Sequence, residues 1–327
     1  MQTNKVSIII PSRNEPFLQN TVKDILKNAA GDVEIIVMLD AYWPDPPLPD
    51  DERVITVHLG KLKGMRANIN SAARISTGKY LMKLDAHCML AEGFDEVLKA
   101  DCEENWLVVP RRYSLDADSW KRKDRKPIDY LYLTFPYTVD DLYGFGFHGR
   151  KWKGEYGLTG GYYHLEDKYK DILIDDIIAF QGSSWFMHKK YFFNIGCMDE
   201  INYNIHQEAS EMGFKVWLSG GRVIRNKKTW YAHLHKGKQH GRGFFLSKRQ
   251  MIWSEVYSTD FWMNNRWEKQ TRPIKWLIDK FWPLEGWPED WDDPKWSKNY
   301  EHPGLKKYPE LRKGYNKGGG GTGGIKN

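Results

Sequence analysis

The stretch Tyr80-Leu81-Met82-Lys83-Leu84-Asp85-Ala86-His87-Cys88 places a carboxylate and an imidazole two residues apart, directly after a short apolar run. The run predicts a buried strand, and residues two apart on a strand face the same side. If the strand stays regular to its end, Asp85 and His87 present one oxygen and one nitrogen ligand to one point. This pair suits Mn²⁺ or a similar ion better than Ca²⁺. An isolated Asp-x-His is more often a turn-capping Asp beside a packed His, so the rest of the chain decides.

The segments around this stretch alternate between predicted strands and helices. Strands are predicted at 5–11, 33–40, 54–59 and 79–84, and helices at 17–30 and 64–73. This alternation predicts an α/β fold with an open, mostly parallel sheet and helices on both faces. Ligands bind outside the carboxyl ends of such strands, where Pro11-Ser12, Asp40 and Asp85–His87 are expected to form one nucleotide pocket. No Gly-x-Gly-x-x-Gly follows the first strand, which argues against a dinucleotide site.

The second half is less regular. Strands are predicted at 178–187 and 228–235, and helices at 191–196 and 207–217. The segment 143–163 is dense in glycine and aromatic residues, and we expect it to be a mobile loop over the pocket.

The composition limits the cellular setting. The 327 residues, 41% of them hydrophobic, are enough for one or two domains. No apolar run is long enough to cross a bilayer, and the first residues lead directly into a strand, so we expect no membrane span and no signal peptide. Cys88, Cys102 and Cys197 have neither a disulfide framework nor zinc spacing. These features predict a cytoplasmic protein.

The net charge of +6 is unevenly distributed. The segment 222–249 contains no acidic residue but nine basic ones, namely Arg222, Arg225, Lys227, Lys228, Lys236, Lys238, Arg242, Lys248 and Arg249. An acid-free stretch of this length indicates an anionic partner. The alternative interpretation is that these residues form an ordinary solvent-exposed basic surface.

The end of the chain has a different composition. Eight of the 15 tryptophans lie between residues 253 and 296. We interpret 246–316 as an aromatic-rich extension that buries its rings against the main domain, since packing is the commoner use of tryptophan. The glycine-rich residues 317–327 are expected to be a disordered tail.

These motifs, in this order, resemble a known family. The order is Pro-Ser-Arg-Asn-Glu at 11–15, Lys-Gly-Met-Arg at 63–66, the segment 76–88, the segment 189–199, and Glu208 before 214–221. It resembles the GT-A nucleotide-sugar glycosyltransferases of the family-2-like type. The greatest similarity is to the polypeptide N-acetylgalactosaminyltransferases, which share the Asp-x-His metal motif. The resemblance implies a GT-A (Rossmann-like) fold, a UDP-sugar donor and a divalent metal, Mn²⁺ or alternatively Mg²⁺.

The resemblance also implies the metal ligands. In the family a further histidine lies twelve positions after a Gly-Gly pair, which corresponds to His233 after Gly220-Gly221. Asp85, His87 and His233 would then hold the metal. The alternative for His233 is an ordinary strand histidine paired with His235.

Further site residues follow from the same resemblance. Those expected to contact the nucleotide are Pro11, Ser12 and Glu15 at the base and ribose, Asp40 at the uracil N–H, and Arg66 and Lys236 at the diphosphate. Glu208 is expected near the anomeric carbon, as general base of an inverting enzyme or as a group that holds sugar or acceptor in a retaining one. The alternatives are a surface helix arginine for Arg66 and a dipole-stabilised helix-start glutamate for Glu208.

The acceptor is less defined. The family's Trp-Gly-Gly-Glu-Asn is replaced by residues 205–209, of which only Glu208 matches. The sequence therefore does not identify which sugar is transferred. The basic and aromatic segment after His233 favours transfer to DNA, as in phage modification of hydroxymethylpyrimidines. The alternatives are protein Ser/Thr, a surface polysaccharide, or a non-catalytic binding module. We expect a glycosyltransferase domain at 1–245, with a nucleotide half at 1–110 and an acceptor and metal half at 111–245.

Overall fold

The computed structural model describes residues 4–137, 149–150, 168–203, 207–236, 240–241, 247–298, 301 and 303–312. The predicted loop at 143–163 and the tail at 317–327 therefore lie almost entirely outside the described residues. None of the described helices combines the length and the apolar character that a membrane crossing needs.

Four parallel strands form the N-terminal half of the sheet, in the spatial order β4-β1-β2-β3. Their bounds are β1 Val6–Ser12, β2 Val33–Asp40, β3 Val54–Leu59 and β4 Tyr80–Leu84. Helices α1 (Leu18–Asn28) and α2 (Met65–Ile75) connect them. Because all four strands run the same way, their carboxyl ends meet at one edge of the sheet.

The sheet continues beyond β4 with strands of mixed direction, in the order β4-β11-β6-β12-β10. The bounds are β5 Cys88–Leu90, β6 Trp106–Asp116, β7 Lys121–Arg122, β10 Ile174–Asp176, β11 Ser184–His188 and β12 Arg222–His233, while β8 Tyr132–Leu133 and β9 Gly149–Arg150 pair separately. Strand β11 runs antiparallel to β4 and β6, and β12 runs parallel to β6. The predicted α/β fold with a mostly parallel sheet is confirmed.

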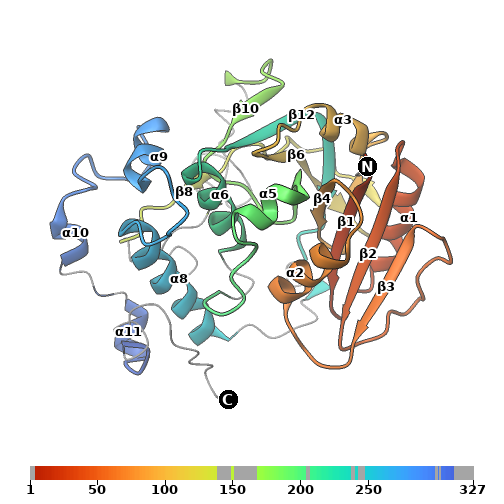
Figure 1. The fold of residues 1–327 in the computed structure, drawn as a ribbon, viewed down its shortest axis with the longest axis horizontal. Coiled ribbons are helices and arrows are strands. Elements are labelled where there is room, and N and C mark those ends of the chain that lie inside the picture. The colour runs from red at the N-terminus through yellow and green to blue at the C-terminus, as the bar shows by residue number, and fades with distance from the viewer. Residues whose placement is uncertain are drawn as a thin grey trace.

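Each face of the sheet is covered by its own core (Figure 1). Alternate residues of β1 divide between the two, since Ile8 and Ile10 pack with α1 and α3 (Phe94–Ala100), whereas Ile9 packs with α2. The second face also carries α5 (Lys189–Asn194) and α6 (Glu208–Leu218). Strands buried on both faces explain why these segments are continuously apolar.

The C-terminal segment forms α8 (Lys248–Met263), α9 (Ile274–Lys280), α10 (Pro294–Lys298) and α11 (Pro303–Lys307), far from β1–β3 (Figure 1). Four of its tryptophans are buried in the same core cluster as α6, namely Trp262, Trp267, Trp287 and Trp291. The Trp262 ring is 0% exposed, and its Nε1–H donates to the Tyr203 hydroxyl at 3.2 Å. The extension thus buries tryptophan rings against the main domain, as predicted.

We expect Trp262→Ala to lower the free energy of unfolding by about 3–5 kcal/mol, because it removes a fully buried ring and leaves a cavity. Urea unfolding would measure the change. Trp43→Ala is the matched control, since Trp43 is 69% exposed and should change stability by less than about 0.5 kcal/mol. Equal losses in both variants would contradict this account of the core.

Candidate active site

Three predicted metal ligands converge at the carboxyl end of β4. The candidate ligand atoms of Asp85, His87 and His233 all lie within 4.8 Å of one another. His233 Nε2 is 3.2 Å from Asp85 Oδ2, and the two imidazole ring centroids are 4.8 Å apart. Strand β12 brings His233 to this point because it pairs with β5, where His233 lies opposite Cys88. We call Asp85, His87 and His233 the triad.

The triad does not arise from strand alternation. Strand β4 ends at Leu84, and Asp85 to His87 form the turn that leads into β5. The turn is fixed by neighbouring segments, since the Asp85 N–H donates to the Ser183 carbonyl and the His87 carbonyl accepts from Leu234. The predicted strand at 79–84 agrees with β4, and Asp85 and His87 converge through the turn after the strand rather than through strand alternation.

The donor set of the triad fits a divalent cation such as Mn²⁺. One carboxylate and two imidazoles are ligands that such ions accept. Burial lowers the pKa of His233 to about 3, although its hydrogen bond to the Asp85 carboxylate opposes the shift. The ring is therefore neutral, which is the form that binds a metal. Its buried Nδ1 has no hydrogen-bond partner among the described residues. The hydrogen bond of the His233 ring is therefore made by Nε2, which points to Asp85.

Glu15 supports the triad from outside. Its Oε2 lies 2.9 Å from His87 Nδ1 and 2.5 Å from Lys236 Nζ. A carboxylate on Nδ1 fixes the ring and leaves Nε2 for a metal. Burial would raise the pKa of Glu15, but its contacts with His87 and Lys236 outweigh that effect and lower the pKa. Glu15 and Lys236, predicted at the nucleotide, thus lie beside the triad.

Lys83 is the site residue that the sequence reasoning missed. It is 1% exposed, and its ammonium lies 2.6 Å from Asp85 Oδ1 and 3.3 Å from Glu208 Oε2. The signal was present, because a lysine inside a continuously apolar strand is rarely buried without an ionic partner. Lys83 therefore connects Asp85 of the triad to Glu208, the residue predicted to lie near the anomeric carbon.

Glu208 is the first residue of α6 and is held on both oxygens. Trp185 Nε1 donates to Oε1 at 3.1 Å, and Lys83 donates to Oε2. A Cβ atom on Gly182 would lie 2.7 Å from Oε2, so only glycine leaves room for the carboxylate. Burial raises the pKa of Glu208, although the charge of Lys83 opposes the shift.

The same ammonium acts on the triad. Burial would raise the pKa of Asp85, but the charge of Lys83, followed by the contacts of His233 and His87, holds that pKa well below its ordinary value. Burial alone would lower the pKa of Lys83, but the negative charges of Asp85 and Glu208 raise it. All three groups interact as one buried ionic cluster.

The remaining nucleotide residues lie at the expected edge of the sheet. Asp40 is 4% exposed and accepts from the Lys63 and Gly64 amides at 2.8 and 3.0 Å, so it fixes the loop before α2. The Ser12 hydroxyl is bonded to the Tyr42 hydroxyl, and Pro11 pairs with β2. Their contact with a base or ribose stays a prediction.

Arg66 has an internal partner. Its guanidinium is 3% exposed, forms an ion pair with Glu211, and lies 4.7 Å from the centre of the Tyr203 ring. The structure therefore gives Arg66 a packing role between α2 and α6, unlike either the surface arginine or the open phosphate ligand considered from the sequence. The phosphate contact stays a prediction.

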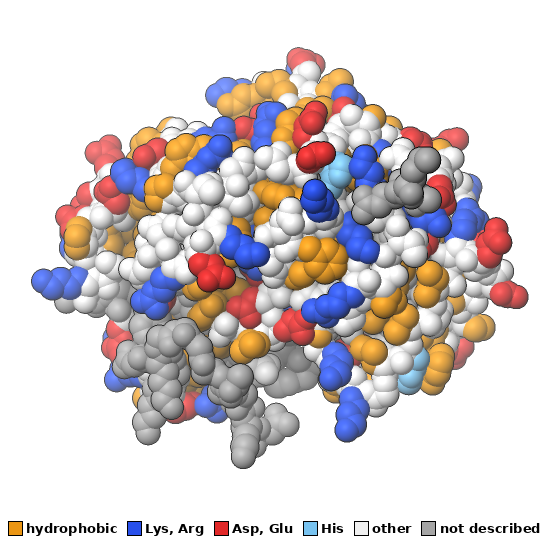
Figure 2. Space-filling model, in the orientation of Figure 1, with side chains coloured by type: hydrophobic (Ala, Val, Ile, Leu, Met, Phe, Trp, Pro, Cys, Tyr) orange, Lys and Arg blue, Asp and Glu red, His pale blue; other side chains and the backbone are white. Residues whose placement is uncertain are grey.

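Several basic residues of the segment 222–249 form ion pairs within the fold, which weakens the reason for expecting a polyanion. Acidic partners come from distant parts of the chain, in the pairs Arg222–Asp176, Lys228–Asp101, Lys236–Glu15 and Arg249–Glu310. Arg225 and Lys227 are buried and donate to backbone carbonyls. On the face seen in Figure 2, acidic and basic side chains are interspersed. Residues 238 and 242 lie outside the described part of the chain.

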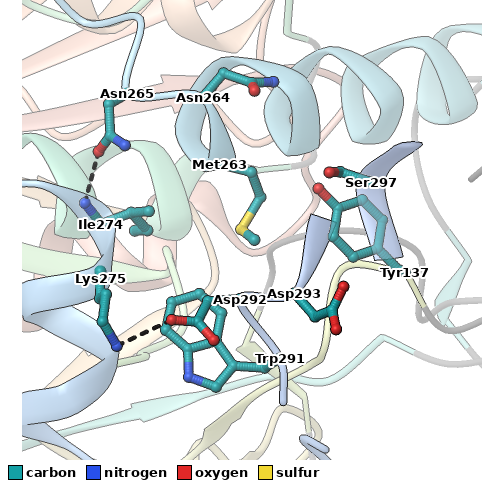
Figure 3. A pocket seen from close by; sticks show the side chains of 10 residues that line it. All are labelled: Tyr137, Met263, Asn264, Asn265, Ile274, Lys275, Trp291, Asp292, Asp293 and Ser297. Carbon is teal, nitrogen blue, oxygen red and sulfur yellow. Dashed lines mark hydrogen bonds and ion pairs between the residues drawn. The ribbon is translucent and has the colours of Figure 1, made fainter. Parts of the chain in front are cut away.

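A cavity of about 150 Å³ lies at the C-terminal helices, away from the triad (Figure 3). Its polar groups already pair with one another, since Lys275 contacts Asp292 at 3.2 Å and the Asn265 side chain accepts from the Ile274 amide at 2.7 Å. The Trp291 ring in its wall is buried. This cavity contains none of the predicted site residues.

Comparison with known proteins agrees with this geometry. Residues 7–156 match the model of the family described as Glycosyl transferase family 2. Polypeptide N-acetylgalactosaminyltransferase 3 from Mus musculus is 27% identical over 285 residues, which cover 79% of this chain and 42% of that protein. The Homo sapiens protein of the same name is 26% identical over 276 residues, with coverage of 79% and 41%. The chain spans less than half the length of these relatives.

The solved structures include one with the same fold. The crystal structure of GalNAc-T7 with UDP, GalNAc and Mn²⁺ aligns with a TM-score of 0.56 and 14% identity, covering 84% of this chain and 57% of that one. The chain therefore has a GT-A glycosyltransferase fold. Within that class it resembles the polypeptide N-acetylgalactosaminyltransferases, as the motifs indicated.

We expect Glu15→Gln to weaken Mn²⁺ binding about 10- to 100-fold, because an amide no longer polarises the His87 ring. Electron paramagnetic resonance of free Mn²⁺ measures the affinity. Glu34→Gln is the matched control, since Glu34 is equally buried but bonds Ser7 and Thr77 instead. The proposed support of His87 is wrong if both variants bind Mn²⁺ with the same affinity as the unmodified protein.

Proposed function

We propose that this chain is a metal-dependent glycosyltransferase that moves a sugar from a UDP-sugar to a serine or threonine hydroxyl of a protein. The observation that carries the proposal is the continuous cluster in which Lys83 joins the triad to Glu208. Such a cluster would put a cation site and a buried carboxylate side by side at the carboxyl edge of the sheet, where such folds bind ligands.

The roles follow from the geometry. Asp85, His87 and His233 would hold a divalent cation, which supplies positive charge to the diphosphate that leaves. Glu15 orients His87 from behind, and Lys236 reaches the same carboxylate, so a basic group lies next to the cation site. Asp40 and Ser12, at the carboxyl ends of β2 and β1, would contact the nucleoside.

Glu208 would hold a hydroxyl group of the sugar or the acceptor. Trp185 donates to Oε1 and Lys83 donates to Oε2, while the Lys83 ammonium also lies 3.3 Å from Oε1. A carboxylate offers about four acceptor positions, so Glu208 can accept a further donor. Because both protein donors come from rigid strands, the carboxylate direction is fixed before the substrate binds. Fixed acceptors of this kind contribute by orienting the reacting groups.

A protein acceptor is favoured over DNA. The relatives are polypeptide transferases by name, and the basic segment that suggested DNA is largely paired inside the fold. A non-catalytic binding module is less consistent with the site, since burying the Lys83 ammonium and the Glu208 carboxylate next to half-buried Asp85 is costly without a function.

The test is turnover of UDP-GalNAc, UDP-GlcNAc and UDP-glucose with Mn²⁺ or with EDTA. Acceptors are a Ser/Thr peptide, DNA that contains hydroxymethylcytosine, and unmodified DNA. We expect Mn²⁺-dependent UDP release and a mass increase of the peptide alone. If only the modified DNA gained mass, the proposed protein acceptor would be wrong. If no donor gave metal-dependent release of UDP, the proposed transferase activity would be wrong.

His87→Ala and His233→Ala are expected to lower this turnover at least about 100-fold, since charge stabilisation by a bound cation is worth several kcal/mol. His188→Ala is the control. His188 is also buried, but it lies opposite Tyr80, at the other end of β4 from the triad. Thermal unfolding of each variant separates loss of the site from loss of the fold.

A further inference from the structure

One buried ammonium is shared by three acceptors at the site. Lys83 Nζ donates to Asp85 Oδ1 and to the Gly182 carbonyl, both at 2.6 Å, and to Glu208 Oε2 at 3.3 Å. A lysine ammonium has three N–H donors, so all are used. The side chain is 1% exposed. Lys83 therefore has no donor left for a phosphate or a sugar, and its role concerns the two carboxylates.

The contacts separate the two oxygens of Asp85. Oδ1 faces Lys83, whereas Oδ2 faces His233 and the rest of the triad. A cation at the triad would therefore meet Oδ2 while Lys83 holds Oδ1. The ammonium limits Asp85 to one ligand atom and fixes its direction.

Glu208 is confined in a similar way. Lys83 holds Oε2 and Trp185 holds Oε1, while the backbone of Gly182 approaches from the side. Without the ammonium, Glu208 would be an uncompensated carboxylate close to a divalent cation. Carboxylate oxygens are good ligands for such ions, so Glu208 would turn toward the metal.

We propose that Lys83 is a positioning residue that keeps Glu208 out of the metal's coordination sphere and directed at the substrate. This inference rests on the proposed function, because it assigns Lys83 a part in the same reaction. A variant that lacks the Lys83 ammonium should therefore bind the metal as tightly as the unmodified protein or more tightly, while its turnover falls.

The test is Lys83→Met, with Mn²⁺ affinity measured by electron paramagnetic resonance and UDP-sugar cleavage measured by UDP release. We expect an Mn²⁺ affinity equal to the unmodified protein or up to about tenfold tighter, because a repelling charge is removed. We expect kcat to fall at least about 100-fold, since Glu208 is misplaced, with KM for the donor nearly unchanged. Parallel loss of Mn²⁺ affinity and kcat, or an unchanged kcat, would overturn the proposal.

A double variant tests whether Lys83 acts through Glu208. The double variant combines Lys83→Met with Glu208→Gln. Its kcat should equal that of Glu208→Gln alone, and its Mn²⁺ affinity should equal that of the unmodified protein, because it has no freed carboxylate that could bind the metal. This pair also keeps the proposal testable if Lys83→Met alone does not fold, since it leaves one buried carboxylate fewer. A further fall in kcat or in Mn²⁺ affinity beyond Glu208→Gln would overturn the proposal.

Lys215→Met is the matched control for burying a methionine in place of a paired lysine. Lys215 is similarly buried and donates to Glu211 at 2.6 Å and to the Cys197 carbonyl at 2.7 Å. It should lose stability but keep its Mn²⁺ affinity. An unmodified protein that binds no Mn²⁺ and cleaves no UDP-sugar would overturn the proposed function and this inference together. Normal binding and cleavage, with Lys83→Met behaving as Lys215→Met does, would overturn the inference alone.

Discussion

The burial of a single ammonium governs the chemistry of this fold. Lys83 lies inside the sheet at 1% exposure, and an unpaired charge there would be strongly destabilising. Asp85 and Glu208 supply the compensation, so the strand that carries the lysine also fixes the two carboxylates that the site needs. In the proposed function, this pairing links the cation site to the carboxylate that is directed at the substrate. Stability and function would then depend on the same three residues.

The topology explains why these groups meet. Parallel strands β1, β2 and β4 bring their carboxyl ends to one edge, and the turn after β4 directs Asp85 and His87 outward. The antiparallel neighbour β11 then supplies Trp185, and β12 returns to deliver His233 beside β5. Segments separated by about half the chain thus form one site. The C-terminal helices carry aromatic rings that close the opposite end of this core.

Much of the fold could be predicted from the sequence, because strands buried on both faces are continuously apolar. The segment 33–40 is such a strand and has the predicted bounds. The edge strand 54–59 also has its predicted bounds, although it is only partly buried, and the triad converges as expected. The turn at 85–87 could not be predicted from the local sequence, since it depends on backbone hydrogen bonds with Ser183 and Leu234, which lie far along the chain. The basic segment is weaker evidence for an anionic partner than the sequence suggests, because acidic residues distant in sequence pair with several of its cations. Lys83 was missed because a lone lysine does not reveal its partners.

The proposed function requires the triad to hold a divalent cation next to a nucleotide diphosphate. A crystal structure with UDP and Mn²⁺, with data collected at the manganese absorption edge, tests this requirement. We expect one anomalous peak within coordination distance of Asp85 Oδ2 and of the Nε2 atoms of His87 and His233, with the diphosphate next to the peak and Glu208 still bonded to Lys83. A peak at another place, or Mn²⁺ coordinated by Glu208 in the unmodified protein, would contradict it.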